Sequence, residues 1–154
     1  MANTQAMATS FKGELLNAYH NFSANNPART VSTADSFKAA LYLASATVNA
    51  TTTAYSATGE VTGTNYTAGG VAITAWNAPT TSGTTGYTTP TASITYTNVT
   101  LSTAFDCVLI YNNTQGNRAV SAHTFGSQTV TAGTFTLTMP SNTTSTALLR
   151  LATT

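Results

Sequence analysis

Apolar side chains recur at helical spacing only near the start of the chain. The apolar positions of residues 10–22 fall three or four residues apart, on one face of a helix: Phe11, Leu15, Tyr19 and Phe22. The pattern predicts an amphipathic helix over this range, with Ser10 as N-cap and Glu14 in the first turn. Gly13 costs such a helix about 1 kcal/mol relative to alanine, so we expect it to dock on its own sheet or on another subunit. The motif Asn25-Asn26-Pro27 ends the pattern.

Beyond residue 34 the pattern changes to the two-residue period of β-strands. Residues 37–44 place Phe37 and Leu41 on one face and Tyr42 on the other, which predicts a strand, although their alanine content also favours a helix. The same reasoning predicts further strands, with Pro79 and Pro140 ending two of them, at residues 71–76, 91–101, 105–111, 118–125, 134–139 and 147–151.

Three of these segments carry additional detail. The apolar positions change parity between Tyr96 and Val99, which predicts a β-bulge near Thr97-Asn98. Residues 105–111 are apolar on both faces, as in a central strand, and the polar stretch 112–117 predicts a hairpin to the next strand. In residues 134–139 the apolar residues Phe135, Leu137 and Met139 alternate strictly with threonines.

Two polar stretches, residues 45–70 and 80–90, are rich in threonine and glycine and are predicted to be exposed loops. About eight strands separated by such loops indicate an all-β fold, an antiparallel two-sheet sandwich that is jelly-roll-like. The length fits one domain over residues 1–154, with an N-terminal arm and helix in residues 1–34 and the sandwich in residues 35–154.

Charge is scarce in this sequence. Five basic and four acidic residues give 6% charged residues and a net charge of +1, whereas soluble domains average about 25% charged residues. Hydroxyl and amide groups must therefore supply the polar surface. The scattered basic residues offer no patch for nucleic acid, and no window is apolar enough for a membrane span. Without a secretory signal pattern, we expect synthesis in a cytosol.

Candidate chemistry is sparse. Cys107 lies in an apolar run and is interpreted as a buried thiol; the alternative, a nucleophile, would need His20 or His123 as its base. We expect Asp106 to pair with Arg118 across the hairpin or to face solvent. We find no catalytic residues, no metal ligands at recognisable spacing and no cofactor motif, so we expect a non-enzymatic protein.

Four segments together resemble small structural proteins of tailed bacteriophages. They are FKGELLNAYHNF at 11–22, DSFKAALYLASAT at 35–47, TTAYSATGEVTGTNYTAGG at 52–70, and LIYNNTQGNRAV with TFGSQTVTAGTFTLTMP at 109–140. Such proteins are similar to capsid decoration or cement subunits, which bind outside a shell of major capsid protein. The resemblance implies a virion protein, made in the host cytoplasm, whose partners are major capsid protein and copies of itself as a dimer or trimer.

Candidate partner contacts follow from apolar and aromatic residues in segments expected to be exposed: Phe11, Leu15, Tyr19, Phe22, Tyr55, Tyr66 and Tyr87. A second hypothesis is a tail-associated or adhesin module that binds carbohydrate, because Trp76 and the tyrosines could stack on sugar rings. A third, a hydrolase using two of the four acids, has no support beyond the presence of those acids.

Overall fold

The computed structural model describes residues 2–16, 18–23 and 33–152. Within these residues the chain forms one helix and eight strands: β1 (Ala6–Met7), α1 (Thr9–Leu16), β2 (Phe37–Leu43), β3 (Val71–Ile73), β4 (Thr80–Ser82), β5 (Thr85–Thr88), β6 (Ile94–Asn112), β7 (Arg118–Leu137) and β8 (Leu149–Ala152). One antiparallel sheet has the order β1-β7-β6-β2-β3, and a smaller one has the order β4-β5-β8. The predicted all-β sandwich of two antiparallel sheets is confirmed.

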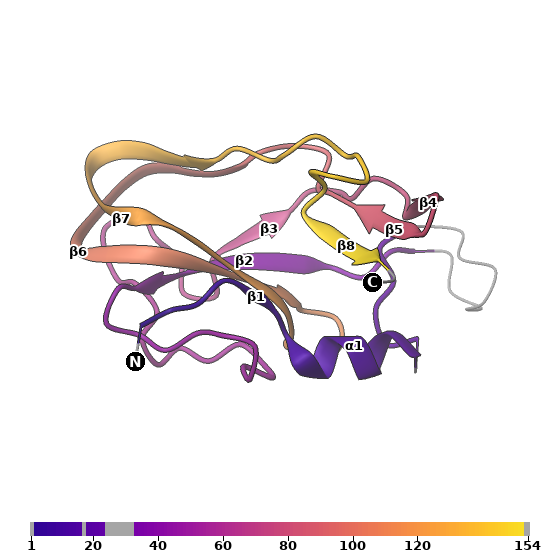
Figure 1. Cartoon of the computed structure of the whole chain (residues 1–154). Coiled ribbons are helices and arrows are strands. Elements are labelled where there is room, and N and C mark those ends of the chain that lie inside the picture. Colours follow the sequence, from indigo (N-terminus) through magenta and orange to yellow (C-terminus); the bar gives the residue numbers. More distant parts are fainter. Residues whose placement is uncertain (1, 17, 24–32, 153–154) are drawn as a thin grey trace.

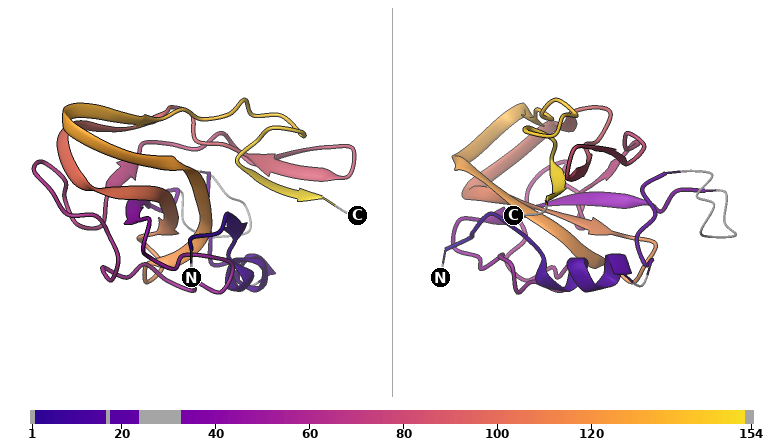
Figure 2. Two further views of the ribbon diagram at one scale, coloured as in Figure 1. Left: turned by 60° about the vertical axis from the view of Figure 1, so that its left-hand side comes forward. Right: turned by 45° about the vertical axis from the view of Figure 1, so that its right-hand side comes forward.

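A long hairpin of β6 and β7 builds both layers of the molecule by folding back on itself (Figures 1 and 2). Phe135 lies opposite Tyr96 in the hairpin, whereas Phe105 lies opposite Gln128. In a straight strand Tyr96 and Phe105 would be about 30 Å apart. The rings of Phe105 and Phe135 nevertheless have their centroids 5.0 Å apart, so the upper half of the hairpin covers the lower half.

The fold of the hairpin follows from irregular pairing at its middle. The register shifts between Tyr96 and Val99, as the change of parity in the sequence predicts, and again three times before Cys107. Asn98 and Ala132 adopt positive φ angles of 52° and 44° on the two strands. Extra residues on one strand bend it and increase its twist, so these bulges let the ribbon turn over its own aromatic side chains.

The sequence places a strand end near residue 125 and a new strand at 134, but the structure has one continuous strand, β7. The separate strands predicted at 91–101 and 105–111 are likewise one continuous strand, β6. Strand β2 is confirmed, and the helical alternative for residues 37–44 is wrong. It lies between β6 and β3 and is buried on both faces. Strand β6 is central from Cys107 to Tyr111 and is buried throughout that stretch, also as predicted.

The polar segment 45–70 contains no strand, but it is not simply an exposed loop. Glu60 is buried and accepts hydrogen bonds from the hydroxyls of Tyr55 at 2.6 Å and Tyr66 at 2.7 Å, and from the backbone N–H of Gly69 at 2.8 Å. Tyr55 also stacks on Tyr111 of β6, with ring centroids 4.8 Å apart. The carboxylate therefore holds the segment together. The segment is attached to the larger sheet by Tyr66, whose hydroxyl accepts from the Leu41 N–H at 3.0 Å, and by Tyr111, whose hydroxyl donates to the Gly69 carbonyl at 2.8 Å.

The helix is shorter than the sequence predicts. It spans Thr9–Leu16, and Ala18 then takes a φ of 55°, the left-handed conformation that commonly ends helices. Ser10 is inside the helix rather than at its N-cap, and Glu14 lies beyond the first turn. Phe22 lies after the helix in extended chain, so it shares no helical face with Phe11. The predicted stop at Asn25-Asn26-Pro27 is outside the described residues.

Residues 80–90 contain the whole hairpin β4–β5 rather than a loop, although β4 is exposed as predicted. This hairpin pairs with β8 near the C-terminal end of the chain, and Figure 1 shows the small sheet at the same end of the molecule as α1. The segment consists mainly of threonine and glycine and lacks the alternation of apolar and polar side chains by which a strand is recognised in a sequence. Leu149 of β8 is buried as predicted, whereas Leu151 is 48% exposed.

Candidate functional site

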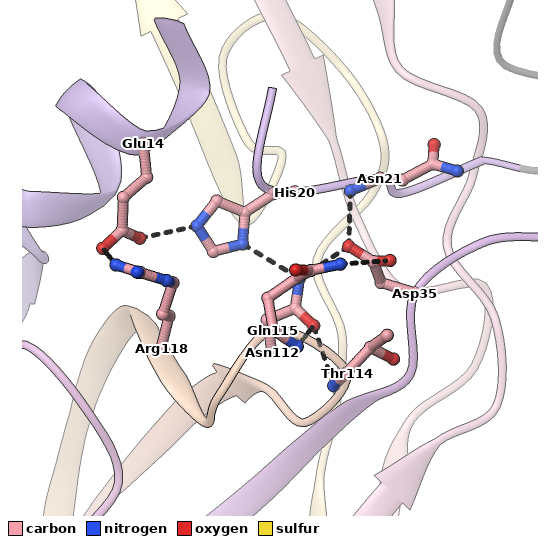
Figure 3. Close-up of polar contacts among 8 residues, drawn as sticks. All are labelled: Glu14, His20, Asn21, Asp35, Asn112, Thr114, Gln115 and Arg118. Carbon is pink, nitrogen blue, oxygen red and sulfur yellow. Dashed lines mark hydrogen bonds and ion pairs between the residues drawn. The ribbon is translucent and has the colours of Figure 1, made fainter. Parts of the chain in front are cut away.

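A buried network of polar side chains joins the N-terminal segment to the turn between β6 and β7 (Figure 3). At its centre is Asn112, which has no exposed surface. Its Oδ1 accepts hydrogen bonds from the backbone N–H groups of Thr114 and Gln115, both at 3.1 Å. Its Nδ2 donates to Asp35 Oδ2 at 2.8 Å and contacts His20 Nδ1 at 3.1 Å. All four hydrogen-bonding positions of the amide are therefore used.

These contacts determine the state of His20. The two backbone donors fix the orientation of the Asn112 amide, so its N–H points at His20 Nδ1, which must accept. The ring proton then lies on Nε2 and is donated to Glu14 Oε2 at 2.8 Å. Burial lowers the pKa of His20 and so favours this neutral form, although the nearby Glu14 carboxylate acts in the opposite direction. Both ring nitrogens are occupied, so neither is available to a substrate.

The network continues to the surface through Glu14. Its Oε1 accepts from Arg118 Nη1 at 2.7 Å, and the Arg118 guanidinium lies over the exposed ring of Tyr19, 4.4 Å from its centroid. The predicted partner of Arg118 is thus wrong: Glu14 takes the place expected for Asp106. Asp106 instead accepts a hydrogen bond from Asn3 Nδ2 at 2.6 Å. The sequence gives no sign of either contact, because both join residues about a hundred positions apart.

An apolar groove of about 450 Å³ lies on the other side of His20, between the N-terminal segment and the small sheet. It is lined by Met7, Phe11, Leu15, His20, Asn21, Phe22, Ser23, Ala78, Pro79, Thr80, Thr81, Gly86, Tyr87, Thr88, Leu149 and Leu151. Phe11 and Phe22 belong to a cluster of aromatic rings with Phe37 and Trp76. The groove has the size of a ligand pocket, but its walls carry few polar groups.

The structure divides the seven predicted contact residues into three groups. Phe11, Leu15, Phe22 and Tyr87 line the apolar groove, although Phe11 and Phe22 are core residues, only 2% and 8% exposed, rather than the exposed contacts predicted. Tyr19 is 40% exposed and lies away from this groove, against Arg118. Tyr55 and Tyr66 are half-buried in the segment 45–70, and their hydroxyls donate hydrogen bonds to Glu60. Burial and the Glu60 carboxylate raise the pKa of both tyrosines, so these hydroxyls remain donors.

The residues considered for catalysis do not form a reactive pair. Cys107 is fully buried, and burial raises its pKa to about 12, so it remains a thiol. It interacts with the backbone of His123 rather than with its ring. The ring of His123 has its Nε2 2.9 Å from Ser121 Oγ, but that serine is buried. These residues are part of the sheet interior.

Trp76 is 9% exposed and packs edge-on against Phe22 and Phe37, which makes it a core residue at the end of a strand. Its Nε1 is buried without a partner. In the described part of the chain, no group of histidine, cysteine and acidic side chains could hold a metal ion. No helix in that same part is long and apolar enough to cross a membrane.

Formal charge is segregated between the two layers. No residue between Glu60 and Asp106, and none between Arg118 and Arg150, carries a formal charge. These two stretches supply the whole upper half of the β6–β7 ribbon and the hairpin β4–β5. The outward side chains of this half of the ribbon are mainly threonines. Thr95 and Thr136, for example, pair across the two strands and are both exposed. Apart from Arg150 on β8, this layer of the molecule is therefore neutral and hydroxylated.

Comparison with known proteins adds no relative: no protein-family model, no curated protein and no solved structure matches this chain.

Proposed function

We propose that this chain is a non-enzymatic structural protein of a tailed-phage virion, a decoration subunit that binds the outside of the head and stabilises the shell. Its partners are then major capsid protein and further copies of itself. The observation that carries the proposal is the neutral upper layer of the fold, bordered by Glu60, Asp106, Arg118 and Arg150 in the sequence. The resemblance of four sequence segments to phage structural proteins supports it.

A neutral, hydroxylated surface suits repeated contact on a lattice. Contacts made by backbone groups and threonine hydroxyls depend little on ionic strength, because salt screens charges. Each contact can be weak, since many copies on one shell add up to a strong total attachment. A rigid β-sandwich offers such a surface without ordering costs on binding.

The test is co-sedimentation of the purified protein with phage heads that lack it, at about 0.05 M and about 1 M salt, where the screening lengths differ severalfold. We expect bound protein at both concentrations, in a fixed ratio to the capsid protein, with less than a twofold difference. Absence of binding, or a steep loss at high salt, contradicts the proposal.

A second candidate function is carbohydrate recognition, and one observation favours it. A polar depression of about 550 Å³ lies next to the buried network and is lined by Ser10, Glu14, Tyr19, Thr53, Ala54, Thr114, Gln115, Gly116 and Arg118. An exposed ring beside hydroxyl, amide and guanidinium groups is suited to a sugar, whereas the covered Trp76 is not. Glycan-array binding that is lost in Tyr19→Ala, with the fold retained, would establish this function instead.

A further inference from the structure

The outer edge of β7 has no neighbour over most of its length. Strand β1 pairs only with Ser121 and Ala122 of β7. Among the described residues, no strand pairs with the outer side of β7 from His123 to Leu137. Figure 1 shows the gold part of β7 along the upper left border of the molecule. Its outward backbone N–H and C=O groups can therefore accept another strand.

The other sheet borders are short or partly covered. On the outer side of β6, where β2 pairs only from Phe105 onward, Thr64 bridges Thr100 and Asn65 Nδ2 donates to the backbone oxygen of Asn98. Strands β1, β3 and β4 have two or three residues, and β8 has four, one of them Arg150. Short strands and charged side chains are the usual protection of a sheet edge against pairing with another chain. The edge of β7 is protected instead by irregular pairing with β6, whose register shifts four times between Tyr96 and Cys107, and by the positive φ of Ala132. Beyond these irregularities, residues 135–137 pair regularly with β6, and residues 133–137 carry no charge or proline.

We propose that a second copy of this chain pairs with that edge. Two β7 segments, residues 133–137, would lie antiparallel about a two-fold axis and join two neutral layers into one surface. The role of this pairing in a shell rests on the proposed function. The inference adds to that function the surface through which copies of the chain associate.

The charge distribution favours a second copy over a foreign strand. Pairing about a two-fold axis brings each charge in a short segment close to the same charge of the second copy, directly opposite on the axis and diagonally across beside it, which is destabilising. A segment that pairs with itself therefore has to be neutral, and no residue between Arg118 and Arg150 is charged. Threonines also suit self-pairing, because Thr–Thr pairs across strands are favourable. Thr134 and Thr136 are exposed on the same face of this edge.

One short strand pair buries less than the roughly 1,200–2,000 Å² of a stable interface. Free protein should therefore dimerise only weakly, in the range of roughly 0.1–1 mM. On a shell, where neighbouring copies are held close together, the effective concentration exceeds this range and the pairing forms.

The test compares the full chain with two charge variants by sedimentation velocity up to about 2 mM, about twice the upper end of the expected dissociation constant. Thr136→Lys places a charge in the edge, opposite Thr134 of the second copy and diagonal to its lysine, and should weaken dimerisation at least tenfold. Thr103→Lys is the matched control, because Thr103 is equally an exposed threonine but lies on β6 in the bend of the ribbon, outside the proposed contact. It should dimerise like the unaltered chain.

Amide hydrogen exchange locates the contact. Exchange of residues 133–137 should slow at high protein concentration in the unaltered chain and in Thr103→Lys, but not in Thr136→Lys. A protein that is monomeric at about 2 mM, or equal dimerisation of the two variants, overturns the inference. If the chain is monomeric while only Thr136→Lys loses binding to phage heads, the edge belongs to a capsid-protein contact; the inference is then wrong and the proposed function stands.

Discussion

Replacing Asn112 by alanine tests whether the buried polar network holds the N-terminal segment on the sheet. The substitution removes four hydrogen bonds, two to backbone N–H groups of the turn, one to His20 and one to the Asp35 carboxylate. A hydrogen bond to a charged group contributes about 1.5–3 kcal/mol and a neutral one about 0.5–1.5 kcal/mol. Water can reach the two part-buried turn donors and offsets some of this loss. We expect a decrease of about 3–5 kcal/mol in the free energy of unfolding.

The assay is urea denaturation followed by circular dichroism, with thermal melting as a second measurement. For a chain of this size each kcal/mol lowers Tm by about 2–4 °C, so the midpoint should fall by about 6–20 °C. The control is Asn113→Ala, the same chemical change one residue later. The Asn113 side chain is exposed, and the backbone N–H that it donates to Ser36 remains. This variant should stay within about 0.5 kcal/mol of the parent.

A loss below about 1 kcal/mol in Asn112→Ala would refute the reasoning. It would mean that His20 and Asp35 find other partners at no cost, and that the network does not anchor the segment.

Three further predictions concern the sheet interior. Burial lowers the pKa of His123 to about 4, so the unfolded chain, with a pKa near 6.5, binds a proton that the native chain does not; stability is complete above pH 6.5 and falls toward pH 4. Between pH 6.5 and pH 4, the free energy of unfolding should decline less in His123→Gln than in the unaltered chain, by at most about 3 kcal/mol. An unchanged dependence of stability on pH contradicts the lowered pKa of His123. Gly70→Ala should prevent folding, because a Cβ there would lie 1.7 Å from the carbonyl oxygen of Ala39, whereas Gly116→Ala, also at positive φ but in open space, should cost only about 1–2 kcal/mol; equal stability of the two would exclude the close approach as the cause. Phe135→Ala should cost about 3 kcal/mol in denaturation, and a near-neutral result would mean that the folded-back ribbon does not depend on this ring.

Much of the fold is predictable because the alternation of apolar and polar side chains along the sequence follows the two-residue period of a β-strand. The strand at Phe37–Leu43, the central strand through Cys107, the hairpin before Arg118 and the bulge near Asn98 all follow from two-residue parity. The strict alternation around Phe135 likewise gives the correct faces.

The errors arise where contacts are distant in sequence. The helix ends early because Ala18 takes a left-handed conformation, although the apolar spacing continues to Phe22. The sequence predicts two strands where the structure has one continuous β7, because the alternation of apolar and polar positions does not reveal that a ribbon folds back on itself. The hairpin β4–β5 has few large side chains, and its pairing with β8 supplies what local propensity lacks.

The candidate site was only partly predictable for the same reason. The sequence predicts Phe11, Leu15 and Phe22 as contacts on one helical face. They do line one groove, but only Phe11 and Leu15 lie on α1, whereas Phe22 follows the helix. Asn112 was read only as the start of a polar turn. A buried asparagine is indicated by its position at the end of an apolar strand, yet its partners His20 and Asp35 are about eighty to ninety residues away and appear only in the folded chain.

The most direct test of the proposed role is a density map of intact particles of a phage whose genome encodes this chain. The account predicts density for the β-sandwich on the outside of the head, with the neutral upper layer in contact with capsid protein or with a neighbouring copy. Density at the tail, or contacts made mainly through the charged lower layer, would contradict it.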